Sequence, residues 1–286
     1  MMITEAAKNL SNEISEIIVL DPTENCPAAQ AGAKQIVGDF KDEDAIVKLA
    51  EQSDIITYEI ESGNTDVLSK VKAEIEPSPS TLGIIQDKLL QKTFLLENEL
   101  PISQFYKITS LDDLRKKINE LGLPVLLKSR RDAYDGRGNY KISSLEEIEK
   151  AYQYFDGKSL MVEKFVDFKM EVSVIAVRNT KGEIAVYPLV ENIHEDNILK
   201  MTVAPARVSD DVINDAGEIA KKTMDVLKGA GVFGIEMFID QNDRILINEI
   251  APRVHNSGHH TLQSCRTSQF EQHLRAILGL ELGSTD

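Results

Sequence analysis

Cysteine is scarce in this chain, because only Cys26 and Cys265 occur among 286 residues. The two lie far apart and in no spacing that a metal site uses, which argues against a zinc module and against a secreted scaffold held by disulfides. Such usage fits a reducing cytoplasm better than an extracellular setting. We therefore expect a cytoplasmic protein.

Long apolar runs are also missing. No stretch approaches the roughly eighteen consecutive apolar residues of a membrane span. Residues 1–5 lack the basic flank and apolar core of a signal peptide. Basic residues are few, since 32 Lys and Arg face 47 Asp and Glu, for a net charge of −15. This charge argues against nucleic acid as a partner, but a few local lysines and arginines can still hold a small anion.

The first part of the chain alternates helical and strand patterns. Helices are expected at 2–9, 41–52 and 65–72, and short apolar strands at 17–20 and 55–58. This alternation predicts a parallel sheet in an α/β layer. Pro77 and Pro79 lie within five residues, so a domain boundary is expected there, with residues 1–78 on its N-terminal side.

The second part is richer in strands. A helix is expected from about 81 to 98, followed by a strand, a glycine-rich loop and a strand from 125 to 142. Three strand-like runs follow between 160 and 190, and then a long amphipathic helix at 208–228. Residues 232–240 and 245–250 are expected to form a hairpin.

The hairpin carries two glutamates. If residues 241–244 form a four-residue loop, Asp240 faces Ile245, and counting back places Glu236 opposite Glu249, with Cβ atoms about 5 Å apart. Two like charges in that position repel, and a divalent cation removes the repulsion. Hard carboxylate oxygens suit Mg²⁺. The alternative is a pair of solvated glutamates, which the apolar character of both strands disfavours.

A glycine-rich loop at 132–139 follows the strand that ends near Lys128. Gly136 and Gly138 allow backbone N–H groups to approach phosphate oxygens, and the lysine adds a positive charge. No Gly-Lys-Ser/Thr sequence opens a helix here, so the loop is no Walker A motif. Taken alone, such a loop is more often a plain hairpin turn, but the nearby carboxylate pair favours phosphate binding.

The segment after the second hairpin strand concentrates polar groups. Arg253, His255, His259 and His260 lie there, and the segment leaves the sheet at the Glu249 end. We therefore expect it to overhang whatever the carboxylates hold. The three histidines could instead bind zinc, but Asn256-Ser257-Gly258 interrupts the helix that an i, i+4 pair needs.

These residues together resemble the ATP-grasp superfamily and, within it, the N5-carboxyaminoimidazole ribonucleotide synthase family. The motifs that carry the resemblance are Tyr134-Asp135-Gly136-Arg137-Gly138, Asn248-Glu249-Ile250-Ala251-Pro252-Arg253, Val254-His255-Asn256-Ser257-Gly258-His259, Asp21-Pro22, Gly38-Asp39-Phe40, Thr57-Tyr58-Glu59 and Thr267-Ser268-Gln269-Phe270-Glu271. They are spread over essentially the whole chain.

The resemblance implies an ATP-grasp fold at 79–286, with 125–168 as its lid, preceded by a truncated Rossmann-like parallel-sheet domain at 1–78. It implies carboxylation of 5-aminoimidazole ribonucleotide by bicarbonate, with ATP and Mg²⁺, through carboxyphosphate. It also implies a homodimer as an assembly and a carboxyaminoimidazole ribonucleotide mutase as the recipient of the product. The other hypotheses are a non-catalytic nucleotide-binding fragment and a related ligase acting on formate or biotin.

The resemblance also assigns residues. Those expected to contact ATP are Lys88, Lys128, Ala133, Tyr134, Asp135, Gly136, Arg137, Gly138, Asn139, Glu163, Lys164, Phe165, Val166, Glu171, His194, Asn248 and Glu249. Glu236 and Glu249 are expected to bind Mg²⁺, and Arg253, His255 and Tyr134 to be catalytic. A guanidinium suits a planar anion such as bicarbonate, and an imidazole suits proton transfer from the amine. The alternatives are surface or packing roles, above all for Lys88, Tyr134, Glu171 and His194.

Some positions depart from the family pattern. Lys88 stands where many relatives have arginine, Val254 where proline is usual, and His260 where an aromatic residue is common. The family's first strand, with its glycine-rich turn, and its small basic C-terminal domain have no counterpart here. We therefore expect a fragment of a longer protein of about 370 residues by family resemblance, with a gap between the strands at 17–20 and 55–58. Such a fragment should bind ATP better than the ribonucleotide.

Overall fold

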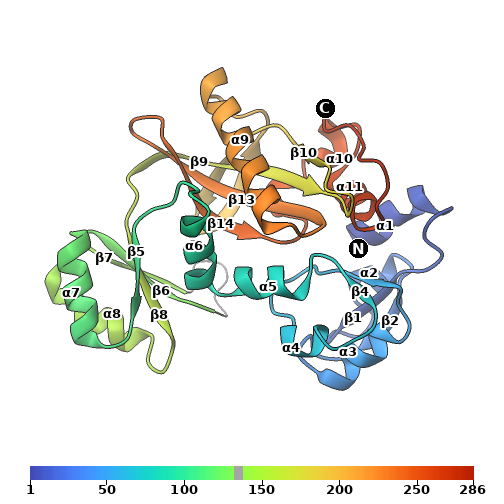
Figure 1. Cartoon of the computed structure of the whole chain (residues 1–286), viewed down its shortest axis with the longest axis horizontal. Helices are drawn as coiled ribbons and strands as arrows, with labels where there is room; N and C mark the ends of the chain where they lie inside the picture. Colours follow the sequence, from blue (N-terminus) through green and yellow to red (C-terminus); the bar gives the residue numbers. More distant parts are fainter. Residues whose placement is uncertain (132–137) are drawn as a thin grey trace.

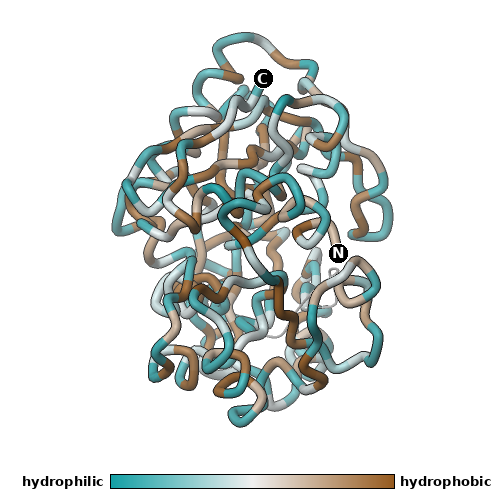
Figure 2. Tube along the Cα trace, turned by 90° about the vertical axis from the view of Figure 1, so that its right-hand side faces the viewer, coloured by the Kyte–Doolittle hydropathy of each residue, from teal (hydrophilic) through white to brown (hydrophobic). Residues whose placement is uncertain are grey.

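The computed structural model describes residues 1–131 and 138–286. Figure 1 shows three regions: an N-terminal α/β region, a small sheet with two helices, and a larger central sheet. Helices α5 and α6 run between them. Hydrophobic segments pass through the interior, and hydrophilic segments form outer loops (Figure 2). None of the described helices is both long and apolar enough to cross a membrane.

The N-terminal region contains two separate pairs of parallel strands, which confirms the predicted parallel α/β layer. Strand β1 (Ile18–Asp21) pairs with β2 (Lys34–Val37), and β3 (Ile55–Ile56) pairs with β4 (Glu74–Ile75). No pairing joins β1 to β3 among the described residues. The helices of the region are α1 (Met2–Ala7), α2 (Pro27–Gln30), α3 (Glu43–Ala50) and α4 (Thr65–Leu68), with a 3₁₀ turn at Lys8–Leu10.

The helix predicted at 81–98 is wrong as a single element. The structure has two helices, α5 (Pro79–Gln86) and α6 (Lys88–Glu97), separated at Asp87. Asp87 has an extended backbone, and its carboxylate accepts from the backbone N–H groups of Leu89 and Leu90. A side chain that caps the second helix in this way must stand outside it, so the chain turns at Asp87.

The small sheet has the strand order β5-β8-β6-β7 and is antiparallel throughout. Its strands are β5 (Phe105–Ile108), β6 (Val125–Ser129), β7 (Asn139–Ile142) and β8 (Leu160–Lys164). Helices α7 (Leu111–Leu121) and α8 (Ile148–Tyr154), the latter preceded by a 3₁₀ turn at Leu145–Glu147, pack with it around one apolar core. We call this unit the lid sheet; it takes in β5 and α7, which precede the range 125–168 expected for the lid.

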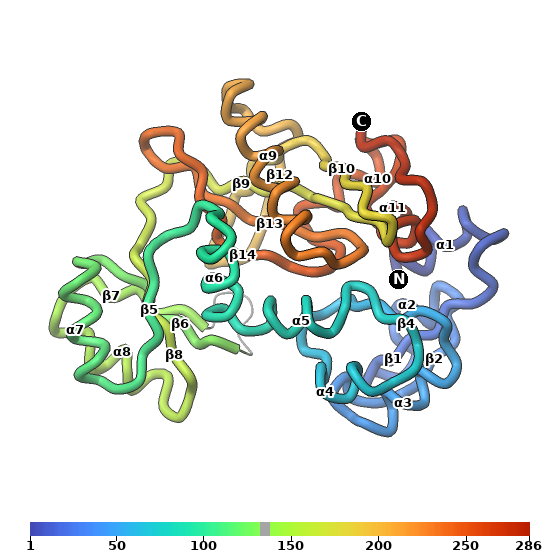
Figure 3. Tube along the Cα trace, in the orientation of Figure 1, coloured from blue at the N-terminus to red at the C-terminus, as the bar shows by residue number. Residues whose placement is uncertain are grey.

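The central sheet has six strands in the order β12-β11-β9-β13-β14, with β10 added to β9. They are β9 (Phe168–Arg178), β10 (Ile184–Val186), β11 (Val190–Glu195), β12 (Ile198–Val203), β13 (Gly231–Asp240) and β14 (Ile245–Ala251). Helix α9 (Asp210–Leu227) packs on the face that carries Val174 and Ala176. Ile175 and Val177 point to the opposite face, as strand alternation requires, and pack with Ala276 of helix α11 (Gln269–Ile277). Figure 3 traces α9 and α11 beside this sheet. The 3₁₀ turn Asn256–Gly258 and α10 (Thr261–Ser264) link β14 to α11.

The β13–β14 hairpin confirms one part of the prediction and corrects another. Glu236 pairs with Glu249 as expected, but Ile239, not Asp240, faces Ile245. The Asp240 carboxylate accepts from the backbone of Asn242 and Arg244, which draws Asp240 into the turn. The register then shifts between Glu236 and Met237, so one extra residue on β14 restores the glutamate pair.

Candidate active site

Glu236 and Glu249 lie opposite each other on neighbouring strands of the central sheet, and each faces a cationic or ionisable group. Lys88, the first residue of α6, holds Glu249 with its Nζ 2.5 Å from Oε1. His255 Nε2 lies 3.2 Å from Glu236 Oε1. Burial alone would raise the pKa of Glu236, but its contact with His255 and the nearby His194 and Lys88 lower it. Both carboxylates are therefore held close to charge-compensating groups.

The register shift decides where Asn248 points. Consecutive residues at a bulge can direct their side chains to the same side of a sheet, which strict alternation forbids. Asn248 is one of the residues that line a small pocket beside Glu236. The others are Glu171, Val172, Asn192, His194, Glu236 itself, Met237 and Phe238. Three oxygen-bearing side chains, those of Glu236, Glu249 and Asn248, thus come from one hairpin. Such hard donors fit a magnesium ion.

Glu171 and His194 face this pocket as a pair. They come from β9 and β11, and His194 Nδ1 lies 2.7 Å from Glu171 Oε2. The hydrogen bond to Glu171 raises the pKa of His194, against an opposing effect of burial. The structure therefore brings together two residues that lie 23 positions apart in the sequence.

Lys128 and Glu163 form a buried ion pair on the lid sheet. Nζ of Lys128 lies 2.7 Å from Glu163 Oε2, and both side chains are less than a tenth exposed. A second lysine, Lys92 of α6, lies 2.7 Å from Glu163 Oε1, and the Ser103 hydroxyl donates to the same oxygen. Burial alone would raise the pKa of Glu163, but Lys128 and Lys92 hold it well below its usual range.

The other residues expected on the adenine strand have separate contacts. Lys164 donates to the carbonyl oxygen of Gly122 at 2.9 Å. The Lys141 ammonium lies 3.9 Å from the centre of the Phe165 ring, a cation–π contact. Val166 is half-buried just after β8. The side chains of Glu163 and Lys164 therefore face different partners.

The glycine-rich loop starts and ends at defined points. The Asp87 carboxylate accepts two hydrogen bonds from the Arg130 guanidinium, at 3.0 and 2.6 Å, and one from that of Arg131, at 3.2 Å. The Gly138 carbonyl accepts from Ser129 N, and Asn139 opens β7 opposite Lys128. The expected site residues Ala133, Tyr134, Asp135, Gly136 and Arg137 lie outside the described residues.

His255 is held by three neighbours. The Gln269 amide accepts from His255 N at 2.9 Å and donates to His255 O at 2.7 Å. The Ser257 hydroxyl lies 2.8 Å from Nδ1. On β13, Gly234 leaves room for the ring, because a Cβ at that position would lie 2.6 Å from both Cβ and Cγ of His255. The imidazole is therefore packed in place with Nε2 toward Glu236.

The three histidines considered for zinc have different partners. His260 Nδ1 lies 2.7 Å from the Ser264 hydroxyl, and the ring of His259 lies beside that of Phe270. Within residues 1–131 and 138–286, no three His, Cys, Asp or Glu side chains form a group that could hold a metal ion. The zinc alternative therefore has no support in this part of the chain.

Arg253 points toward the N-terminal region. Its Nε lies 2.7 Å from Glu61 Oε1, and one of its terminal nitrogens donates to the carbonyl oxygen of Val254. Glu61 follows the Thr57-Tyr58-Glu59 motif but was not singled out from the sequence. The partnership spans 192 positions of sequence, and nothing local signals it.

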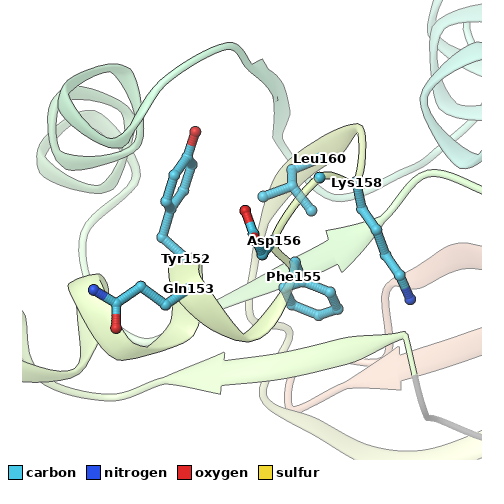
Figure 4. Close-up of a pocket in the computed structure, with 7 residues that line it drawn as sticks. Tyr152, Gln153, Phe155, Asp156, Lys158 and Leu160 are labelled. Carbon is cyan, nitrogen blue, oxygen red and sulfur yellow. The ribbon is translucent and has the colours of Figure 1, made fainter.

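Sequence reasoning also missed Lys92, and it placed Gln269 in a family motif without giving it a role. Lys92 follows Lys88 by four positions, so both share one face of a helix, and this spacing could have suggested it. A cavity of about 350 Å³ between α8 and β8 was not foreseen either. It is lined by Tyr152, Gln153, Phe155, Asp156, Gly157, Lys158 and Leu160 (Figure 4). None of these residues belongs to the expected site.

Comparison with known proteins covers the whole chain. A family model described as "Ribonucleotide synthetase preATP-grasp domain" matches residues 1–86, and one described as "ATP-grasp domain" matches residues 93–270. The N5-carboxyaminoimidazole ribonucleotide synthase of Bacillus subtilis is 39% identical over 100% of this chain and 75% of its own length. The phosphoribosylaminoimidazole carboxylase of Candida albicans is 42% identical over 98% of this chain, which spans about half (50%) of that protein.

Solved structures agree with this similarity. An ADP complex of an N5-carboxyaminoimidazole ribonucleotide synthetase superposes with a TM-score of 0.94 at 38% identity, over 100% of this chain and 75% of that one. The synthase of Aspergillus clavatus, bound to ADP and 5-aminoimidazole ribonucleotide, superposes with a TM-score of 0.93 at 39% identity. The match covers 99% of this chain and 75% of that one. The predicted order, an ATP-grasp fold after a pre-ATP-grasp domain, is confirmed.

Proposed function

Because the chain belongs to the N5-carboxyaminoimidazole ribonucleotide synthase family of ATP-grasp ligases, we propose that it takes part in carboxylating 5-aminoimidazole ribonucleotide. Bicarbonate is first phosphorylated by ATP to carboxyphosphate, whose carbon is then transferred to the exocyclic amine. The products are N5-carboxyaminoimidazole ribonucleotide, ADP and phosphate. The reaction belongs to purine biosynthesis.

One observation carries this proposal: the facing pair Glu236 and Glu249, with His255 and Arg253 on the segment that leaves the same end of β14. Phosphoryl transfer needs positioning and charge neutralisation at the phosphates. The carboxylate pair, with Lys88 and Lys128 beside it, provides groups suited to both. Carboxyl transfer then needs an anion site and a proton acceptor next to the phosphates.

We assign the nucleotide site to residues on both sheets. Lys88 and Lys128 bind phosphates, residues 133–139 cover them, and residues 163–166 meet the adenine. Glu171 holds the ribose hydroxyls, His194 orients Glu171, and Asn248 lies beside Glu249. The contact between Glu171 and His194 supports this assignment, because a hydrogen-bonded carboxylate is fixed in direction.

Glu236 and Glu249 would hold Mg²⁺, the standard cation of the family, which neutralises phosphate charge when bound. The oxygen donors of the hairpin fit such an ion. For Glu249 to bind the ion, Lys88 must release or share the carboxylate. The ammonium of Lys88 can then contact the phosphates.

Arg253 and His255 are proposed to act on the carboxyl group. The guanidinium of Arg253 can bind bicarbonate or carboxyphosphate through two parallel hydrogen bonds. His255 can take up the proton that the amine loses. Tyr134 is assigned to the same site from the family motif alone.

Several broader assignments stay proposals. The domain boundary is placed at 78/79, and the lid at 125–168, extended here by β5 and α7 because they share the lid sheet. Both cysteines are free, which supports a reducing cytoplasm. A homodimer, and transfer of the product to a carboxyaminoimidazole ribonucleotide mutase, follow from the family resemblance.

The test is ADP release by the chain, measured with and without 5-aminoimidazole ribonucleotide and bicarbonate. Release that needs both, together with carboxylated product, is the expected result. ATP binding without turnover would instead support a non-catalytic nucleotide-binding fragment. Release that depends on formate or on biotin would identify a related ligase of another specificity.

A further inference from the structure

Lys92 is a buried lysine that the proposed reaction does not use. Its side chain is 4% exposed, and its Nζ lies 2.7 Å from Glu163 Oε1, on β8 of the lid sheet. The same nitrogen donates to the carbonyl oxygen of Ile247 at 3.1 Å, on β14 of the central sheet. One side chain of α6 therefore joins strands of two separate sheets at the nucleotide site.

Helix α6 is fixed to β14 by the neighbours of Lys92. The amide of Gln91 accepts from Ile250 N at 3.1 Å and donates to Ile250 O at 3.3 Å, so it occupies both backbone groups of that residue. One turn earlier, Lys88 holds Glu249. Because these side chains hold neighbouring parts of the strand, Lys92 cannot shift along β14 without breaking other contacts.

Glu163 is in direct contact with two ammonium groups, Lys92 at Oε1 and Lys128 at Oε2, so these three side chains together carry one surplus positive charge. Farther away, Glu249 attracts both lysines and Glu236 attracts Lys128. Burial lowers the pKa of Lys92, and the nearby Glu163 opposes that effect. An unbalanced charge in a buried position is costly unless a counter-ion reaches it. A nucleotide phosphate can supply that counter-ion.

We infer that Lys92 is a positioning residue for ATP, which acts through Glu163 on Lys128. Because Lys92 holds Oε1, the Glu163 carboxylate is shared between two lysines. Its negative charge then offsets the charge of Lys128 only in part, and Lys128 can attract the phosphates. Without Lys92, Glu163 and Lys128 form a neutral pair. The inference rests on the ATP binding of the proposed function and does not depend on which acceptor is carboxylated.

The test is the Kd of MgATP, measured by calorimetry on the full chain and on Lys92→Met, which removes the charge and keeps the length. We expect binding to weaken about tenfold, the size of one lost charge-assisted contact. The matched control is Lys222→Met. The Lys222 ammonium also donates to a backbone carbonyl, that of Glu99, but in an exposed position on α9, and its loss should leave the Kd unchanged.

The double variant Lys92→Met with Glu163→Gln separates charge from structure. The neutral glutamine no longer cancels Lys128, so MgATP affinity should recover from the level of Lys92→Met toward that of the original chain. A purely structural role for Lys92 predicts weaker binding still. If Lys92→Met does not fold, Lys92→Gln, which donates to the same acceptors without charge, replaces it with the same expectation.

Unchanged affinity in the single variant, no recovery in the double variant, or no MgATP binding by the original chain would each overturn the inference. Ribonucleotide- and bicarbonate-dependent ADP release is measured in parallel on the original chain. Its absence, with MgATP binding intact, would refute the proposed carboxylation and leave the result for Lys92 standing.

Discussion

At the residue scale, the carboxylates of Glu236 and Glu249 show how the site tolerates like charges on adjacent strands. Lys88 Nζ lies 2.5 Å from Glu249 Oε1, and His255 Nε2 lies 3.2 Å from Glu236 Oε1. The lowered pKa of Glu236 keeps that carboxylate ionised and ready to bind a cation. These two contacts relieve the repulsion between the neighbouring carboxylates.

Glu249→Gln should abolish magnesium-dependent turnover and leave the fold intact. The amide keeps the shape of the side chain but offers the ion one neutral oxygen, and it no longer attracts Lys88. We expect ADP release to fall about 10²-fold or more, measured at saturating MgATP. The unfolding transition in urea should change little, because a similar shape remains and the lost ion pair with Lys88 involves a half-exposed carboxylate, which contributes little to stability. Unchanged ADP release would remove Glu249 from the metal site.

At the element scale, strand β13 makes room for His255. Gly234 lies two residues before Glu236, and a methyl group there would overlap the imidazole. A strand position normally favours a β-branched residue, so glycine here weakens the strand but permits the close approach of the ring. The strand thus contributes both a carboxylate and the space for the histidine that contacts it.

Gly234→Ala should displace His255 and reduce carboxylated product, while MgATP still binds. A shift of about 1 Å in a reacting group can cost about 10²-fold in rate. The measurement is product formation beside the Kd of MgATP. Gly217→Ala, in helix α9, is the matched control, since a Cβ there meets nothing within 4 Å. Equal losses in both variants, or product formation unchanged in Gly234→Ala, would contradict the steric role of Gly234.

Local patterns predicted most elements but not how they end. The alternation of apolar residues located the hairpin, and the Glu236–Glu249 pair was right even though the turn was counted wrongly, because the bulge on β14 compensates for the shift. Propensity could not show that the helix expected at 81–98 breaks at Asp87. Asp87 caps the second helix there, and Arg130 and Arg131, which lie more than 40 positions later, hold the same carboxylate.

At the scale of the whole molecule, single long-range contacts join the N-terminal region to the central sheet. Arg253 reaches Glu61, and Thr57 Oγ1 lies 2.7 Å from His273 Nε2, a separation of 216 positions. Helix α1 packs on α11 in the same area. The motifs at Thr57 and at Gln269 were recognised separately, but only the fold shows that they meet. Contacts of this kind leave no periodic signal in the sequence, so they could not be predicted from it.

His273 makes this junction sensitive to pH. The ring is fully buried, accepts from Val232 N at Nδ1, and meets the Thr57 hydroxyl at Nε2. Burial lowers its pKa from 6.5 to about 4. Between these pH values, His273 therefore binds a proton in the unfolded chain but not in the folded chain. The contribution of the neutral histidine to the free energy of unfolding is fully present above about pH 6.5 and declines as the pH falls toward 4. The shift corresponds to about 3 kcal/mol in the free energy of unfolding.

Urea unfolding at several pH values between 7 and 4 measures this loss, and His273→Gln isolates it. Glutamine can accept from Val232 N and donate to Thr57 without gaining a charge, so the variant should lose less stability over that interval than the original chain does. It should also be less stable at pH 7, because an amide fills the space of the imidazole imperfectly. Parallel curves for the two proteins between pH 7 and 4 would show that groups other than His273 cause the acid sensitivity.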